Sequence, residues 1–155
     1  MKRLLSLLLA FASCEAKSIV TDDLVHKVAI IESNVNEKAI GDGGWSRGAF
    51  QIKESTWKDA VNYSRLVGEG PHDPFLPDDW MTYSMQYEYA SHAASLILRM
   101  HEERMIKNKI KPTPLKLYMA YNMGYNQAAS FNFNEDTTHG RRRAVLLRAK
   151  QILSK

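Results

Sequence analysis

The segment from Gly41 to Gly48 limits the fold of this 155-residue chain more than any other, because four of its eight residues are glycine. Glycine weakens helices and strands and is the usual residue of tight turns. The segment therefore predicts a turn or loop that separates the elements on either side. A short strand is expected to follow over residues 49–52, which read Ala-Phe-Gln-Ile.

Apolar residues at three- and four-residue spacing predict helices on both sides of this loop. In the first helix, capped by Thr21 or Asp22, one apolar row holds Leu24, Val28 and Ile31. The second helix is expected to begin at Ser55 or Thr56, and the third to run from Asp78 or Asp79 to about Met105. The fourth is expected to begin at Thr113-Pro114 and to end at Gly124. The last is expected to run from about Gly140 to Leu153. The fold class is therefore mostly α, a single domain with at most a small β element near residues 41–52.

The spacing also predicts which side chains of the later helices face the core. They are Trp57, Ala60, Val61, Tyr89, Ala93, Leu96, Ile97, Met100, Leu117, Tyr118, Tyr121, Val145, Leu146, Ala149 and Ile152.

Residues 1–16 have the order of an export signal: a basic head, an apolar stretch and then small residues. The apolar stretch, Leu4 to Ala12, is too short to span a bilayer, so no membrane span is expected. Cleavage after Ala16 is one interpretation, and a lipid anchor on Cys14 is the other. A buried N-terminal helix is the third alternative. Since Cys14 is the only cysteine, the folded domain contains no disulfide.

The net charge of +4 is mild and suits an anionic polymer as partner. The densest basic stretch is Arg141-Arg142-Arg143. Nucleic acid is not expected as a partner, because no basic face is interleaved with aromatic residues and no groove-reading motif is present. These arginines are interpreted as the solvent-exposed start of a helix. The protein is expected to be a monomer.

Glu32 is the main candidate for chemistry, because it lies on or beside the apolar stripe near the end of the first helix. A carboxylate in such a place is costly unless it has a partner or a purpose. Burial raises the pKa of a glutamate, and a glutamate with a raised pKa can protonate the leaving oxygen of a glycosidic bond. The alternative is a helix-end glutamate that reaches solvent or caps a neighbouring segment.

Three segments stand out together: Glu32-Ser33, residues 48–52 (Gly-Ala-Phe-Gln-Ile) and residues 120–124 (Ala-Tyr-Asn-Met-Gly). They resemble the signature motifs of the soluble lytic transglycosylase and goose-type lysozyme family. The third is identical to the family motif at its fixed positions, whereas the second has Ala-Phe in place of Leu-Met. The resemblance covers about residues 22–128 and implies a lysozyme-like fold.

The resemblance also implies a reaction on peptidoglycan glycan strands. Glu32 would protonate the β1,4-glycosidic oxygen between N-acetylmuramic acid and N-acetylglucosamine, and then act as base while the muramyl C6 hydroxyl closes a 1,6-anhydro ring. No cofactor is implied, and the five histidines lack metal-ligand spacing, so no metal site is expected. The implied substrate contacts are Ser33, Ser46, Gly48, Gln51, Tyr121 and Asn122, with Tyr121 either stacking on a sugar or hydrogen-bonding Glu32.

Asp42 leaves a second mechanism open. Its place after Gly41 is similar to that of an aspartate in goose-type lysozymes, and with Glu32 it would make an inverting muramidase that positions a water. The alternative is a turn aspartate that bonds its own backbone. Lys53 stands where a second aspartate is often found in goose-type enzymes. A wall-binding or assembly module without turnover is the third hypothesis.

Overall fold

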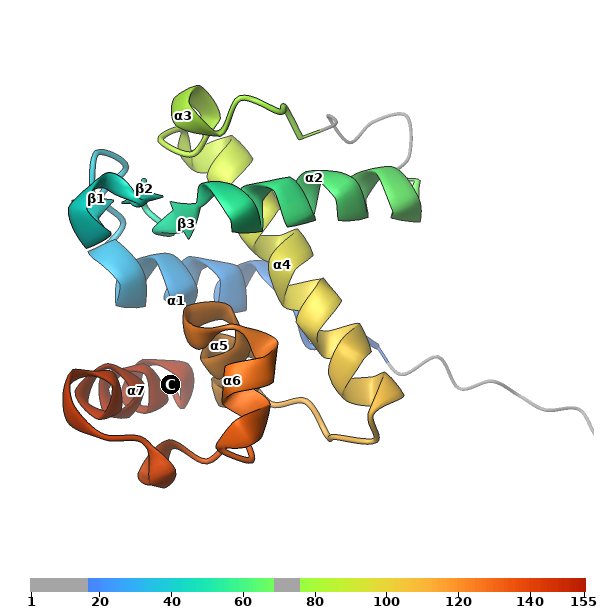
Figure 1. The fold of residues 1–155 in the computed structure, drawn as a ribbon, viewed down its shortest axis with the longest axis vertical. Coiled ribbons are helices and arrows are strands. Elements are labelled where there is room, and N and C mark those ends of the chain that lie inside the picture. Colours follow the sequence, from blue (N-terminus) through green and yellow to red (C-terminus); the bar gives the residue numbers. More distant parts are fainter. Residues whose placement is uncertain (1–16, 69–75) are drawn as a thin grey trace, which may run out of the picture.

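The computed structural model describes residues 17–68 and 76–155 as seven α-helices and a small three-stranded sheet, with two 3-10 turns (Figure 1). In chain order these elements are α1 (Asp22–Ser33), β1 (Ile40–Gly41), η1 (Asp42–Gly44), β2 (Ser46–Arg47), β3 (Ile52–Lys53), α2 (Glu54–Val67), α3 (Trp80–Tyr83), α4 (Tyr87–Lys107), α5 (Pro114–Met123), α6 (Tyr125–Ser130), η2 (Glu135–Thr137) and α7 (Gly140–Leu153). The predicted class, mostly α with a small β element, is confirmed. The expected export signal at residues 1–16 lies outside the described residues.

The start and stop signals read from the sequence work as expected in three helices. The hydroxyl of Thr21 accepts a hydrogen bond from the Leu24 N–H and caps α1, and the hydroxyl of Thr113 caps α5 in the same way. Gly124 ends α5 with a positive φ of 83° and an extended ψ of 144°, a combination that favours glycine. The bounds of α7 match the predicted helix from Gly140 to Leu153.

The prediction of one long helix from Asp78 or Asp79 to Met105 was wrong, because residues 84–86 separate α3 from α4. Asp79 does cap a helix, but the short α3, and Gln86 then takes an extended conformation with φ −108° and ψ 119°. The break allows the Tyr87 N–H, which begins α4, to donate to the Glu37 carboxylate at 3.3 Å. Tertiary contacts thus override an uninterrupted helical pattern.

Two further boundaries differ from the predictions. Helix α2 begins at Glu54 rather than at Ser55 or Thr56, and no side chain caps it. The short helix α6 follows directly after Gly124, where the sequence gave no separate start signal.

The sheet lies partly inside the segment that was predicted to be a loop. Its antiparallel order is β1-β2-β3, with Ile40 opposite Arg47 and Ser46 opposite Lys53. The strand predicted over residues 49–52 was wrong except at its last residue. Residues 48–51 instead form a turn, with positive φ at Gly48 (75°) and Gln51 (51°).

Helix α4 runs obliquely through the domain, with α2 and α3 toward one end of the view and α5, α6 and α7 toward the other (Figure 1). Ten of the expected core side chains are buried: Trp57, Ala60, Val61, Ala93, Leu96, Ile97, Leu117, Tyr118, Leu146 and Ala149. The other five are only partly buried: Tyr89, Met100, Tyr121, Val145 and Ile152. No helix within residues 17–68 and 76–155 has the length and apolar character needed to cross a membrane.

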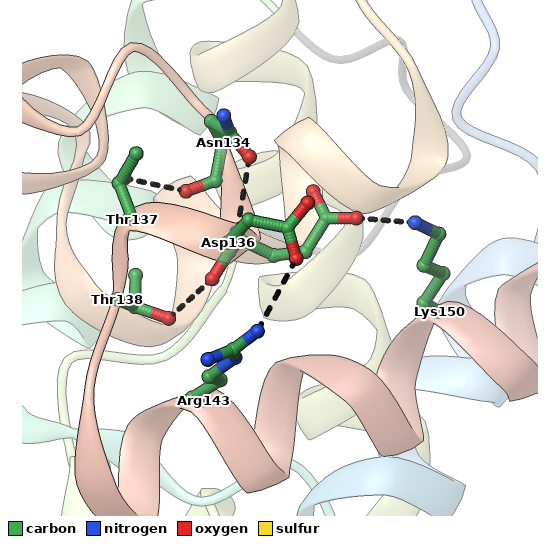
Figure 2. Close-up of polar contacts among 7 residues, drawn as sticks. Asn134, Asp136, Thr137, Thr138, Arg143 and Lys150 are labelled. Carbon is green, nitrogen blue, oxygen red and sulfur yellow. Dashed lines mark hydrogen bonds and ion pairs between the residues drawn. The ribbon is translucent and has the colours of Figure 1, made fainter.

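The turn η2 is fixed to α7 by two ion pairs (Figure 2). Lys150 donates to the Glu135 carboxylate, and Arg143 lies 3.7 Å from the Asp136 carboxylate. The hydrogen bond from Lys150 lowers the pKa of Glu135 below its usual value. These contacts tie η2 to both the first and the last turn of α7 and turn Arg143 toward η2.

Candidate active site

Glu32 lies in the last turn of α1, where the helix ends abruptly. The next two positions after Ser33 are left-handed, with φ 57° at Asn34 and 62° at Val35. The Asn34 N–H donates to carbonyls of the last turn and closes the helix. Because the other face of α1 is buried in the core, the Glu32 side chain is partly buried at the edge of that core.

Two donors from α5 converge on one oxygen of this carboxyl. The Tyr118 hydroxyl donates to Glu32 Oε1 at 2.8 Å, and the Asn122 amide reaches the same oxygen at 3.4 Å. Tyr118 and Asn122 are four residues apart, so they lie on one face of α5. Tyr118 was expected from the sequence only as a core residue, although its i,i+4 relation to Asn122 was a signal that the two share a face.

Burial is the main cause of the raised pKa of Glu32. The hydrogen bonds from Tyr118 and Asn122 lower it, the charge of Asp42 raises it, and Arg148 lowers it, but burial prevails. The pKa of Tyr118 is raised far above its usual value by burial and by the Glu32 charge, so this hydroxyl remains a donor. A carboxyl that holds its proton and a fixed donor beside it are suited to general acid catalysis.

Glu32 opens into a cleft of about 1200 Å³, bounded by α1, the sheet, α4, α5, α6 and the start of α7. Six of the eight expected site residues line it: Glu32, Asp42, Ser46, Gln51, Tyr121 and Asn122.

The other two expected residues, Ser33 and Gly48, hold backbone beside the cleft instead of lining it. The Ser33 hydroxyl donates to the Ala49 carbonyl at 2.7 Å and so ties the end of α1 to the turn after β2. At Gly48, a Cβ atom would lie 1.8 Å from the Ser84 carbonyl oxygen, and φ is 75°. Only glycine fits this contact between the sheet and the break before α4.

Both the nitrogen and the oxygen of the Gln51 side-chain amide form hydrogen bonds to other groups of the protein. Its nitrogen donates to the carbonyls of Ala39 (3.2 Å) and Gly48 (2.9 Å), and its oxygen accepts from the Ser46 hydroxyl at 3.0 Å. Gly41 leaves room for this amide, because a Cβ there would lie 2.2 Å from its oxygen. Gln51 and Ser46 therefore hold the floor of the cleft together.

Tyr121 also fastens the cleft floor. Its hydroxyl donates to the Phe50 carbonyl at 2.8 Å. One expected role of Tyr121 was a hydrogen bond to Glu32, but Tyr118 makes that bond instead. The pKa of Tyr121 is raised well above its usual value, chiefly by burial and then by the Glu32 charge. Ala49 and Phe50, which depart from the family motif, are fully packed.

Asp42 differs from Glu32 in its exposure and in its partner. Its carboxylate pairs with Lys53 Nζ at 2.9 Å, and the two side chains are 60% and 54% exposed. An ion pair this open to water is weak, but Lys53 still offsets the charge of Asp42. The cleft thus combines one buried acid with one exposed and paired carboxylate.

In the described part of the chain, no three or more His, Cys, Asp or Glu side chains form a group that could hold a metal.

The protein-family comparison matches the Transglycosylase SLT domain over residues 10–141. No curated protein and no solved structure matches the chain significantly. The family match spans most of the chain, and the helical fold and the cleft around Glu32 agree with it. The chain therefore belongs to the SLT transglycosylase family, whose members are lytic transglycosylases acting on peptidoglycan.

Proposed function

We propose that this protein cleaves the β1,4 bond between N-acetylmuramic acid and N-acetylglucosamine, with Glu32 as its single catalytic acid and base and a 1,6-anhydromuramyl end as product. The observation that carries this proposal is the raised pKa of Glu32 in the cleft, together with the two donors on its Oε1. Because its pKa is raised, Glu32 keeps a proton at higher pH than a solvated glutamate does, and the donors stabilise the carboxylate once the proton has left.

The reaction requires no third reactant. Glu32 gives its proton to the glycosidic oxygen as the bond from that oxygen to the muramyl C1 breaks. The carboxylate then takes the proton of the C6 hydroxyl while O6 bonds to C1, so Glu32 regains its starting state. Tyr118 donates to the carboxylate between the two steps and remains protonated throughout.

Asp42 decides between this reaction and hydrolysis. An inverting hydrolase needs a second carboxylate as base for a water. Asp42 lines the same cleft, which supports the muramidase alternative, but it is exposed and paired with Lys53. Lys53 already engages one oxygen of this carboxylate, and this favours the transglycosylase.

The test is mass spectrometry of muropeptides released from purified peptidoglycan by the wild type, Glu32→Gln and Asp42→Asn. We expect anhydromuramyl products from the wild type and Asp42→Asn, and none from Glu32→Gln. Reducing muramyl ends that disappear in Asp42→Asn would establish the hydrolase instead. No release from several types of wall would favour the wall-binding module.

Peptidoglycan lies outside the cytoplasmic membrane, so action there is extracytoplasmic. We propose that residues 1–16 direct export, that Cys14 is either removed with them or lipidated, and that the enzyme acts as a monomer. Metabolic labelling with a radioactive fatty acid, compared with Cys14→Ser, separates the two fates of Cys14.

A further inference from the structure

The three arginines at residues 141–143 open α7, where positive charge opposes the helix dipole and where no acidic residue offsets it within the first turn. Arg143 turns away to Asp136 on η2 (Figure 2). Arg141 and Arg142 instead line the cleft that contains Glu32. Within residues 17–68 and 76–155, neither of these two forms an ion pair with an acid. Unfavourable charges that a fold retains beside its active site point to a function.

Arg142 is oriented by a neutral partner on α6. With the Gln127 amide in the orientation that satisfies both of its ends, its oxygen accepts from Arg142 Nη1 at 2.9 Å and its nitrogen donates to the Met123 carbonyl at 3.1 Å. An amide oxygen holds a guanidinium in place and leaves its charge uncompensated.

Arg104 reaches the same cleft from α4 and is held in a similar way. Its Nη2 donates to Asn126 Oδ1 at 2.7 Å, and its guanidinium lies 4.0 Å from the centre of the Tyr125 ring. Neighbouring amides of α6, Asn126 and Gln127, thus fix one arginine each. Both guanidinium groups are pre-oriented, and neither is used in the acid–base steps at Glu32.

We propose that Arg104 and Arg142, assisted by Arg141, form a subsite for a free carboxylate of the peptide stem that substituted muramyl residues carry. This inference rests on the proposed function, since it assumes a peptidoglycan strand in the cleft. Arginine forks match carboxylates in charge and geometry. In the intact wall the lactyl carboxyl of muramic acid is consumed in the amide bond to the stem, so the stem provides the carboxylates. The enzyme therefore prefers peptide-bearing strands over denuded ones.

The test measures binding of Glu32→Gln protein, which cannot cut, to three solubilised probes. They are strands with intact stems, strands stripped of stems by an amidase, and chitin oligosaccharides, which carry no carboxylate. Arg142→Gln is compared with Arg143→Gln, which removes the same charge from the same helical turn outside the cleft. We expect Arg142→Gln to weaken binding to intact strands about tenfold, and Arg143→Gln to change it less than about twofold.

On stripped strands and chitin oligosaccharides, Arg142→Gln should bind within about twofold of its parent. Equal losses on intact and stripped strands would assign the arginines to the glycan backbone that both probes share, and a loss on stripped strands alone would assign them to the lactyl carboxylate. Either result would overturn the stem proposal. No loss on intact strands would overturn the subsite itself. Binding is measured without turnover, so this test is independent of the proposed reaction. If the wild type released no muropeptides but binding still showed a preference for stems that depends on Arg142, the proposed reaction would be wrong and the subsite would remain supported.

Discussion

Glu32 must hold a proton in one step and release it in the next, and its neighbours serve the two states separately. Burial favours the protonated acid, whereas the hydrogen bond from Tyr118 favours the carboxylate. The balance between them sets the pH at which the acid is available.

Replacing Tyr118 by Phe is expected to lower kcat about tenfold, because the carboxylate formed on proton transfer loses its closest donor. The same change removes an interaction that lowers the pKa of Glu32, so this pKa rises further. The limb of the pH–rate profile on which Glu32 loses its proton then moves to higher pH. Tyr121→Phe is the control: it loses a bond to the Phe50 carbonyl and should leave that limb in place.

Asp42→Asn is expected to reduce kcat/KM by less than about threefold, because the carboxylate is exposed and already paired with Lys53. The measurement is initial-rate release of muropeptides at a pH on the plateau of the profile. A loss of about a hundredfold or more would show that Asp42 takes part in the chemistry.

Single residues were predictable from the sequence where a motif fixed them. Glu32 stands at the predicted helix end, and the Asn122 amide donates to its carboxyl group although the two residues are ninety positions apart in the chain. The engaged amide of Gln51 was not predictable, because its acceptors at Ala39 and Gly48 depend on how the turn closes. Arg104 and Arg142 were missed because they meet the cleft only through the packing of α4 and α7 around α6.

Among the elements, the sheet depends on one close contact. Gly48 sits against the Ser84 carbonyl at the break between α3 and α4, and its N–H donates to the Ala39 carbonyl at 2.9 Å. This contact joins the floor of the cleft to the start of the longest helix.

Gly48→Ala is expected to destabilise the protein by about 3 kcal/mol or more, because the added methyl meets a backbone atom and φ is positive. Urea unfolding followed by circular dichroism measures the loss. Gly68→Ala is the control. Gly68 is also left-handed (φ 59°), but beyond its chain neighbours no atom of residues 17–68 and 76–155 lies within 4 Å of where its Cβ would stand, so this variant shows the conformational cost alone. Equal losses in the two variants would contradict the role given to the Ser84 contact.

Helix ends with local caps were predictable because their signals are contained within one turn. Thr113 and Gly124 mark both ends of α5. The break before α4 and the three strands were not predictable, since each strand has two residues and is held by pairing across the turn. Elements this short are determined by tertiary contacts rather than by their own sequence.

For the molecule as a whole, the raised pKa of Glu32 is a cost in stability. The folded state binds this proton more tightly than the unfolded chain does, so the stability that Glu32 contributes is fully present below its unfolded pKa. It is lost as the pH rises through the folded pKa. The domain therefore gives up stability at neutral pH for a functional acid.

Glu32→Gln is expected to raise the free energy of unfolding at pH 7 by about 1 kcal/mol, or roughly 2–4 °C in Tm. The amide oxygen of Gln can still accept from Tyr118, while the buried charge is gone. Thermal melts of both proteins at pH 4 and pH 7 test this, since the gain should shrink at the lower pH. A gain of the same size at both pH values would rule out the carboxylate charge as its source.

The hydrogen bond between Glu32 and Tyr118 joins residues that are 86 positions apart in the chain. The raised pKa of Glu32 therefore exists only once the chain between them has folded. In a chain that has not yet folded, Glu32 is an ordinary solvated glutamate, deprotonated at neutral pH and without a cleft. Folding itself is therefore the activation step, because only the folded chain brings the acid, its donor and the cleft together.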